Sequence, residues 1–221
     1  MIVNGPSVNT TVAELNIGST GNGTAELRLQ SGVTLTLAPG QVGNGRITVG
    51  SKGTLSGNGE ITGDVVVQPL GTLSPGQTVG QLTIHGSLTL QSSGSDHAQL
   101  NIDVDVSPSP LVTPGVTFDL LTVSGSGKTF TVGGANLNVT AHPNVLLGEA
   151  YVIVKAVNGA TIDHTTKFAN LVGGTSYTSP NMKYNVSYSS SDITITFSYV
   201  PEPVGFLPLS LAAVLHRRRR R

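Results

Sequence analysis

The sequence predicts an all-β fold whose first half is a parallel β-helix, and three observations support this. Short phrases recur about every twenty residues from Val12 to about Gly94. Within each unit apolar residues occupy every second position, which is typical of a strand with one buried face. Between the strands lie corners rich in glycine or containing proline. Because one short strand cannot bury its apolar face alone, such units stack into a solenoid.

The recurring phrases are of two kinds. The first comprises Gly32-Val33-Thr34-Leu35, Gly53-Thr54-Leu55-Ser56, Gly71-Thr72-Leu73-Ser74 and Gly86-Ser87-Leu88-Thr89, at intervals of 21, 18 and 15 residues. The second comprises Gly43-Asn44-Gly45-Arg46-Ile47-Thr48 and Gly57-Asn58-Gly59-Glu60-Ile61-Thr62. The Gly-Asn-Gly segments lack the lysine and the following helix of a phosphate-binding loop, so we interpret them as tight corners. Alternating pairs such as Ile47 and Val49 or Leu82 and Ile84 predict the buried face.

The stretch from Gly71 to Ile84 reads Gly-Thr-Leu-Ser-Pro-Gly-Gln and then, from Val79, Val-Gly-Gln-Leu-Thr-Ile. It resembles the repeat of autotransporter-type passenger domains, and the resemblance extends over roughly residues 50 to 105. In that family such phrases mark successive turns of a right-handed parallel β-helix. The resemblance therefore implies an architecture and no particular activity.

From Gln99 onward the pattern changes to longer alternating strands. Leu100, Ile102, Val104 and Val106 alternate with polar residues, and further strands are predicted at 118–123, 130–132, 137–139, 151–157, 184–188 and 193–199. Most aromatic residues lie in this half. We expect three parts: β-helix repeats at 1–98, a β-rich cap or small sandwich at 99–199 that protects the open end of the solenoid, and a terminal segment at 200–221 with a short hydrophobic helix.

The last twenty-two residues consist of three parts in a fixed order. They begin with Val200, Pro201, Glu202 and Pro203 and end with Arg217, Arg218, Arg219, Arg220 and Arg221. Between these lies an apolar run of twelve residues that contains Val204, Gly205, Phe206, Leu207, Leu209, Leu211, Val214 and Leu215. A standard transmembrane helix needs about 20 residues, and Pro208 would kink this one. Arginines directly after an apolar run predict a C-terminus that stays in the cytoplasm.

This terminal segment resembles the PEP-CTERM sorting signal of bacteria. The resemblance implies export to the cell surface or extracellular space, transient membrane anchoring by the tail, and cutting by an exosortase-like membrane enzyme. The alternative is a basic tail behind a buried hydrophobic strand. A secretory signal peptide should then lie at the N-terminus, but the first residues contain neither a basic region nor an apolar core. Two interpretations remain: the sequence is a fragment or has a late start site, or the tail is not a working signal. We favour the first, because the repeats are already under way at residue 12.

The composition narrows the possible function classes. The chain has no cysteine, which excludes thiolate catalysis, thiolate metal sites and disulfides. The formal charge of the full chain is zero. Without the residues from Pro201 onward, the chain has seven basic and eleven acidic residues and therefore a net charge of −4. No basic patch predicts nucleic-acid binding. We therefore expect the arginines to serve membrane topology.

We assign no catalytic residue, metal site or cofactor from the sequence. Asp103 and Asp105 have a spacing suited to acid/base chemistry or calcium, but we interpret them as part of a solvated strand face. Four histidines, His85, His97, His142 and His164, lack the spacing of a zinc site. Thr34 with Thr36 and Thr194 with Thr196 are pairs of the type that order water on an ice-binding solenoid, but they lie far apart in the sequence.

The sequence thus favours a non-enzymatic bacterial surface or extracellular-matrix protein. Its partners would be an exosortase-like enzyme, the membrane through the tail, and exopolysaccharide or other copies of itself. The alternatives are a carbohydrate-binding adhesin or a polysaccharide-active enzyme on the same scaffold, and then an ice-binding protein. A cleft lined by three or more carboxylates would favour the enzyme.

Overall fold

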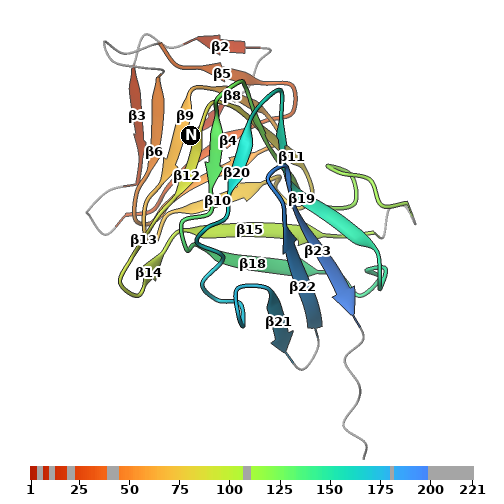
Figure 1. Ribbon diagram of the computed structural model, residues 1–221. Helices are drawn as coiled ribbons and strands as arrows, with labels where there is room; N and C mark the ends of the chain where they lie inside the picture. Colours follow the sequence, from red (N-terminus) through yellow and green to blue (C-terminus); the bar gives the residue numbers. More distant parts are fainter. Residues whose placement is uncertain are drawn as a thin grey trace, which may run out of the picture.

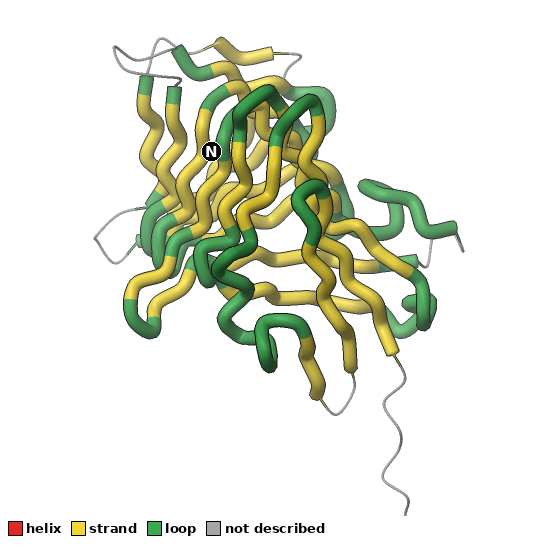
Figure 2. Tube along the Cα trace, viewed as in Figure 1, coloured by secondary structure: helices red, strands yellow, loops and turns green. Residues whose placement is uncertain are grey.

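The computed structural model describes residues 1–3, 7–9, 13–18, 23–38, 45–106, 111–179 and 182–198. These residues form strands, turns and loops, and no helix occurs among them (Figure 2). The predicted all-β class is confirmed.

Three parallel sheets make up the body of the molecule. Sheet A contains β1 (Ile2–Val3), β4 (Ala25–Leu29), β7 (Gly53–Gly57), β10 (Thr72–Pro75), β15 (Gln99–Val104) and β18 (Asn136–Ala141). Sheet B contains β2 (Ser7–Asn9), β5 (Thr34–Thr36), β8 (Glu60–Thr62), β11 (Gln81–His85), β16 (Leu120–Ser124) and β19 (Ala150–Val157), and sheet C contains β3 (Glu14–Ile17), β6 (Arg46–Val49), β9 (Asp64–Val67), β12 (Leu88–Leu90), β17 (Thr129–Thr131) and β20 (Thr161–Asp163). The chain passes through A, B and C six times, so the predicted parallel β-helix is confirmed (Figure 1).

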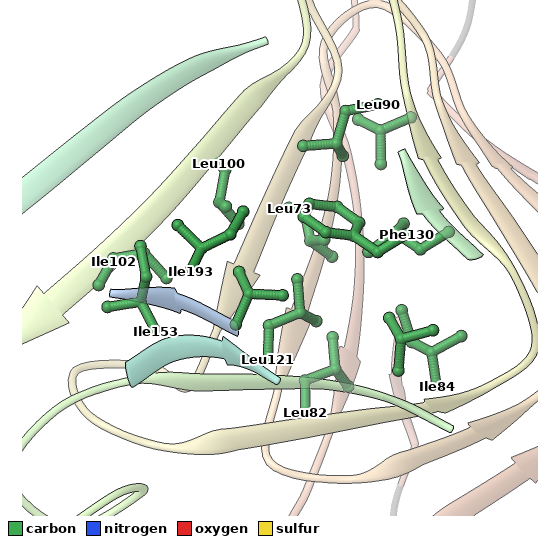
Figure 3. Close-up of a cluster of buried hydrophobic side chains, with 14 of the residues drawn as sticks. Leu73, Leu82, Ile84, Leu90, Leu100, Ile102, Leu121, Phe130, Ile153 and Ile193 are labelled. Atoms are coloured by element: carbon green, nitrogen blue, oxygen red, sulfur yellow. The ribbon is translucent and has the colours of Figure 1, made fainter. Parts of the chain in front are cut away.

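The register of each sheet places equivalent apolar residues on top of one another. In sheet A the stack is Leu27, Leu55, Leu73, Leu100 and Leu137. In sheet C it includes Ile47, Val65, Leu88 and Phe130, and in sheet B it includes Leu35, Ile61, Ile84 and Val123. All of these side chains are buried, and residues from the three sheets meet in the interior (Figure 3). Stacking thus supplies the continuous core that a single turn lacks.

The predicted corners lie where close backbone approach requires glycine. Gly57, at the end of β7, has a φ of +115°, and a Cβ there would overlap the carbonyl oxygen of Leu29 on the preceding turn. Only glycine adopts such a conformation readily. The Gly57-Asn58-Gly59 segment is therefore a corner between sheets A and B.

The β-helix extends further than the sequence predicted. The predicted boundary at residues 98 and 99 does not mark a change of architecture, because β15 to β20 pair in parallel with the preceding turns and add two more. The aromatic residues that suggested a sandwich partly fill this interior instead: Phe130 is fully buried in the sheet C stack. Longer strands and the loop after β15 altered the repeat spacing without altering the stacking.

The cap is antiparallel and starts only at β21. Strands β21 (Ser176–Ser179), β22 (Met182–Tyr188) and β23 (Asp192–Ser198) continue sheet B, with β23 pairing antiparallel to β19. Edge-to-face contacts join Tyr151 to Phe118 and to Phe197, with ring centroids 5.4 and 5.5 Å apart. A cap that follows the β-helix, as predicted, thus covers the otherwise open edge of β19.

A small hairpin, β13 (Ser92–Ser93) with β14 (Asp96–His97), projects between the fourth and fifth turns (Figure 1). Among the described residues we find no helix with the length and hydrophobicity needed to span a bilayer. The hydrophobic helix predicted after residue 203 lies outside the described residues.

Candidate functional site

The outward side chains of the β-helix form ordered polar columns. Successive side chains along a strand point to opposite sides of a sheet, so the residues between the core positions face outward. On sheet A most of them are uncharged over four turns: Thr54, Ser56, Thr72, Ser74, Gln99, Asn101, Asn136, Asn138 and Thr140, with Asp103 of β15 as the acidic exception. Asn138 Nδ2 donates to Gln99 Oε1 at 3.0 Å and to Asn101 Oδ1 at 2.9 Å. The amides of this face therefore bind one another.

The outward face of sheet B is hollowed, and we call this region the sheet B trough. One column of its floor is Thr34, Glu60 and Thr83; the neighbouring column is Thr36, Thr62 and His85. A hollow of about 430 Å³ lies against the first column and extends to Asn58 and Gln81. A second hollow of about 480 Å³ lies against the other column. Ligand pockets typically have volumes of about 300–1,000 Å³.

The loop between β15 and β16 forms the wall of the first hollow through Pro114, Gly115 and Val116. Hydrogen bonds hold residues 113–117 of this loop: Thr113 N donates to Thr117 Oγ1 at 2.8 Å, and Thr117 N donates to Thr113 O at 2.8 Å. Val116 is 53% exposed although it is apolar. A fixed apolar wall thus stands beside a polar floor.

The second hollow is bounded by Ser124, at the end of β16, and by the turn that follows, which contributes Gly125, Ser126 and Lys128. Lys128 Nζ donates to Asp64 Oδ1 at 3.1 Å, and the same oxygen accepts a hydrogen bond from Ser87 N at 2.7 Å. The positive charge beside the second hollow is therefore paired with a carboxylate of sheet C.

The centre of the trough contains a polar contact, in which Glu60 Oε2 lies 3.1 Å from His85 Nε2. Both side chains are about half exposed. Among the described residues that line the two hollows, Glu60 is the one carboxylate. Glycoside hydrolysis typically uses two carboxylates that flank the scissile bond. The chemistry offered here is hydrogen bonding by hydroxyl, amide and carboxylate groups.

The acidic pair singled out in the sequence lies at the end of β15. Burial raises the pKa of Asp103, while a hydrogen bond from Thr140 and the charge of His142 oppose that rise. Asp105 Oδ2 lies 3.8 Å from His142 Nδ1. Asp103 therefore faces Thr140 of β18, and His142, just beyond that strand, lies near both acids.

A third acid, Asp119, was not singled out from the sequence. It is fully buried, and its Oδ1 and Oδ2 accept hydrogen bonds from Gly80 N at 2.7 Å and from Asp103 N at 2.8 Å. Burial raises the pKa of Asp119 to about 8, against the effect of these two donors. Asp119 thus links the β15–β16 loop to β15 and to the corner before β11. A lone acid in a loop has no periodic signal that would reveal this role.

The four histidines lie apart from one another. Beyond the pairs that His85 and His142 form, His97 Nδ1 lies 2.7 Å from Gly134 O, and the ring of His164 stacks on Tyr188 at 5.8 Å between centroids. Within the described part of the chain, no three His, Cys, Asp or Glu side chains group as metal ligands do.

The two threonine pairs do not form one ladder. Thr34 and Thr36 lie on β5 in the sheet B trough, whereas Thr194 and Thr196 lie on β23 in the antiparallel cap. The columns through Thr34 and Thr36 do reach Thr83 and Thr62, but Glu60 and His85 interrupt them. An unbroken threonine face, as ice binding would need, is therefore absent from the described part of sheet B.

The predicted sorting segment cannot be placed in the structure. Val200 to Pro203, the apolar run and the five arginines lie outside the described residues. No protein-family model matches this sequence, and a comparison with curated proteins finds no significant match.

Proposed function

We propose that this chain is an exported bacterial surface or extracellular-matrix structural protein, which a PEP-CTERM-type signal delivers to the cell surface. The observation that carries the proposal is the order of the last residues: Val200-Pro201-Glu202-Pro203, an apolar run, and Arg217 to Arg221. Proline at two of the four motif positions disfavours both helix and strand pairing. A sequence that disfavours regular structure suits recognition by a processing enzyme.

The fold supports this proposal by the place where it ends. The last described strand, β23, closes at Ser198 and is paired on both sides, by β19 and by β22. Cutting in the motif would therefore leave the β-helix and its cap intact.

The proposed route involves an exosortase-like membrane enzyme and transient anchoring by the tail. We assign the apolar run to the membrane and the arginines to the cytoplasmic side, where the positive-inside bias holds them. The body then remains outside the cell, where exopolysaccharide and other copies of the protein are the partners expected.

Replacing Glu202 with Ala tests the sorting step in a host that carries an exosortase-like enzyme. The variant should accumulate as unprocessed precursor in the membrane fraction, as should a deletion of Arg217 to Arg221. Glu149→Ala, at an exposed acid of the body, serves as the matched control and should be processed normally. Unchanged processing of Glu202→Ala, followed by immunoblotting, would defeat the assignment.

A carbohydrate-binding adhesin on the same scaffold is the second candidate function. The observation that favours it is the sheet B trough, with its two adjoining hollows, polar floor and apolar wall. Such an adhesin would use the same export route, so the two functions are compatible.

A further inference from the structure

The floor of the trough has the hydrogen-bonding character of a site for hydroxyl-rich molecules. Thr34 and Thr83 each provide a hydroxyl that both donates and accepts, Gln81 provides an amide, and Glu60 a carboxylate. Sugar hydroxyls likewise donate and accept. A floor that offers both functions on three successive turns matches such a ligand better than one that offers donors alone.

The wall supplies the apolar half of the same recognition. Pro114 and Val116 line the first hollow, and Val116 is among the few large apolar residues of the described chain that are exposed. A pyranose ring presents C–H groups on its faces and hydroxyls at its rim. A ring in the first hollow would lay one face on this wall and direct hydroxyls to the floor, burying exposed apolar surface.

The charges on and around the trough favour a neutral ligand. Lys128 pairs with Asp64, so no lysine or arginine among the described residues that line the hollows lacks a counter-charge, and the carboxylate of Glu60 contacts His85. Without its tail the body carries seven basic and eleven acidic residues. A net negative body repels a polyanion at long range.

The size and rigidity of the trough indicate more than one sugar unit. The two hollows, of about 430 and 480 Å³, adjoin across the Glu60–His85 pair. Leu82 and Ile84, between the floor residues of β11, are fully buried in the core. The wall is held by the Thr113–Thr117 hydrogen bonds. A preformed site spends less binding free energy on ordering itself.

We propose that the sheet B trough binds a neutral polysaccharide, with one chain occupying both hollows and crossing the Glu60–His85 pair. The proposal rests on the proposed function, because an exported protein is the kind that meets such a polymer. Its test uses purified protein and does not depend on sorting. If the protein did not bind polysaccharide, the proposed delivery route would be unaffected. If the tail were not processed, the proposed binding site would be unaffected.

Affinity electrophoresis of the full chain provides the test, in native gels cast with galactomannan, laminarin or hydroxyethylcellulose, and with alginate as the polyanion. The wild type should be retarded by at least one neutral polymer and not by alginate. The double variant Gln81→Ala/Thr83→Val removes an amide and a hydroxyl from the floor and should bind that polymer at least about tenfold more weakly. Val116→Ser should weaken binding through the wall.

Thr131→Val is the matched control, because Thr131 is a half-buried outward threonine of sheet C, away from the trough. It should bind like the wild type, and melting curves should show that every variant folds. Three results would overturn the proposal: migration of the wild type unchanged in all three neutral gels, retardation by alginate alone, or equal losses in the control and the trough variants.

Discussion

Asp119 shows how one side chain fixes the position of a long loop. Its two carboxyl oxygens accept hydrogen bonds from Gly80 N and Asp103 N, which belong to different turns of the β-helix. A backbone hydrogen bond joins Asp119 and Asp103 as well, since Asp119 N donates to Asp103 O at 2.9 Å. The loop held in this way continues to the wall of the trough, at Pro114 to Val116.

Replacing Asp119 with Asn should change how stability depends on pH. Burial raises the pKa of Asp119 from 3.8 to about 8, so in that interval the folded protein holds a proton that the unfolded chain has lost. Protonated Asp119 contributes its full stabilising free energy below the unfolded pKa of 3.8. This contribution is lost as the pH rises toward the folded pKa of about 8. Wild type should thus lose stability relative to Asp119→Asn between about pH 5 and pH 8.

Urea unfolding of both proteins across this pH range measures the difference in their free energies of unfolding. The comparison removes the contributions of groups that the two proteins share. A difference that stays constant with pH, or that shifts in favour of the wild type as the pH rises, would contradict a raised pKa at Asp119.

Little of the candidate site was visible in the sequence, because the site depends on register. Thr34, Glu60 and Thr83 lie more than twenty residues apart in sequence and become neighbours only when β5, β8 and β11 pair. The alternating pattern indicates that each faces outward, but not which residue lies beside it. No repeat or alternation in the sequence singles out Asp119.

At the level of elements, the strands were predictable where their alternation and spacing were regular. Residues such as Ile47, Val49, Leu82 and Ile84 are fully buried, as the period of two requires. The end of the β-helix was predicted too early, at residue 98. The long segment between β15 and β16 enlarges the fifth turn, and this loop breaks the sequence spacing although the strands remain in register.

Replacing Gly57 with Ala should strain the corner between β7 and β8. The residue has a φ of +115°, and its Cβ would overlap the carbonyl oxygen of Leu29. We expect a loss of roughly 1–3 kcal/mol in the free energy of unfolding, the cost of a strained backbone position. The measurement is the urea midpoint.

Gly23→Ala is the control for this change, since a Cβ at Gly23 meets nothing within 4 Å. It should alter stability by less than about 0.5 kcal/mol. If Gly57→Ala is as well tolerated as Gly23→Ala, the corner does not have the tight backbone approach described here.

At the scale of the whole molecule, all described strands precede the proposed sorting segment. Six turns share one core, and the antiparallel cap covers the edge of the last turn in sheet B. The formal neutrality of the full chain depends on its last five arginines, so processing would leave an acidic body.

We propose above that this body is delivered to the cell surface and separated from its tail. The most direct test is the intact mass of the protein recovered from the cell exterior of a host with an exosortase-like enzyme. We expect a protein whose last residue lies near Val200 to Pro203 and which lacks all five arginines. Recovery of the protein with Arg217 to Arg221 still attached would contradict it.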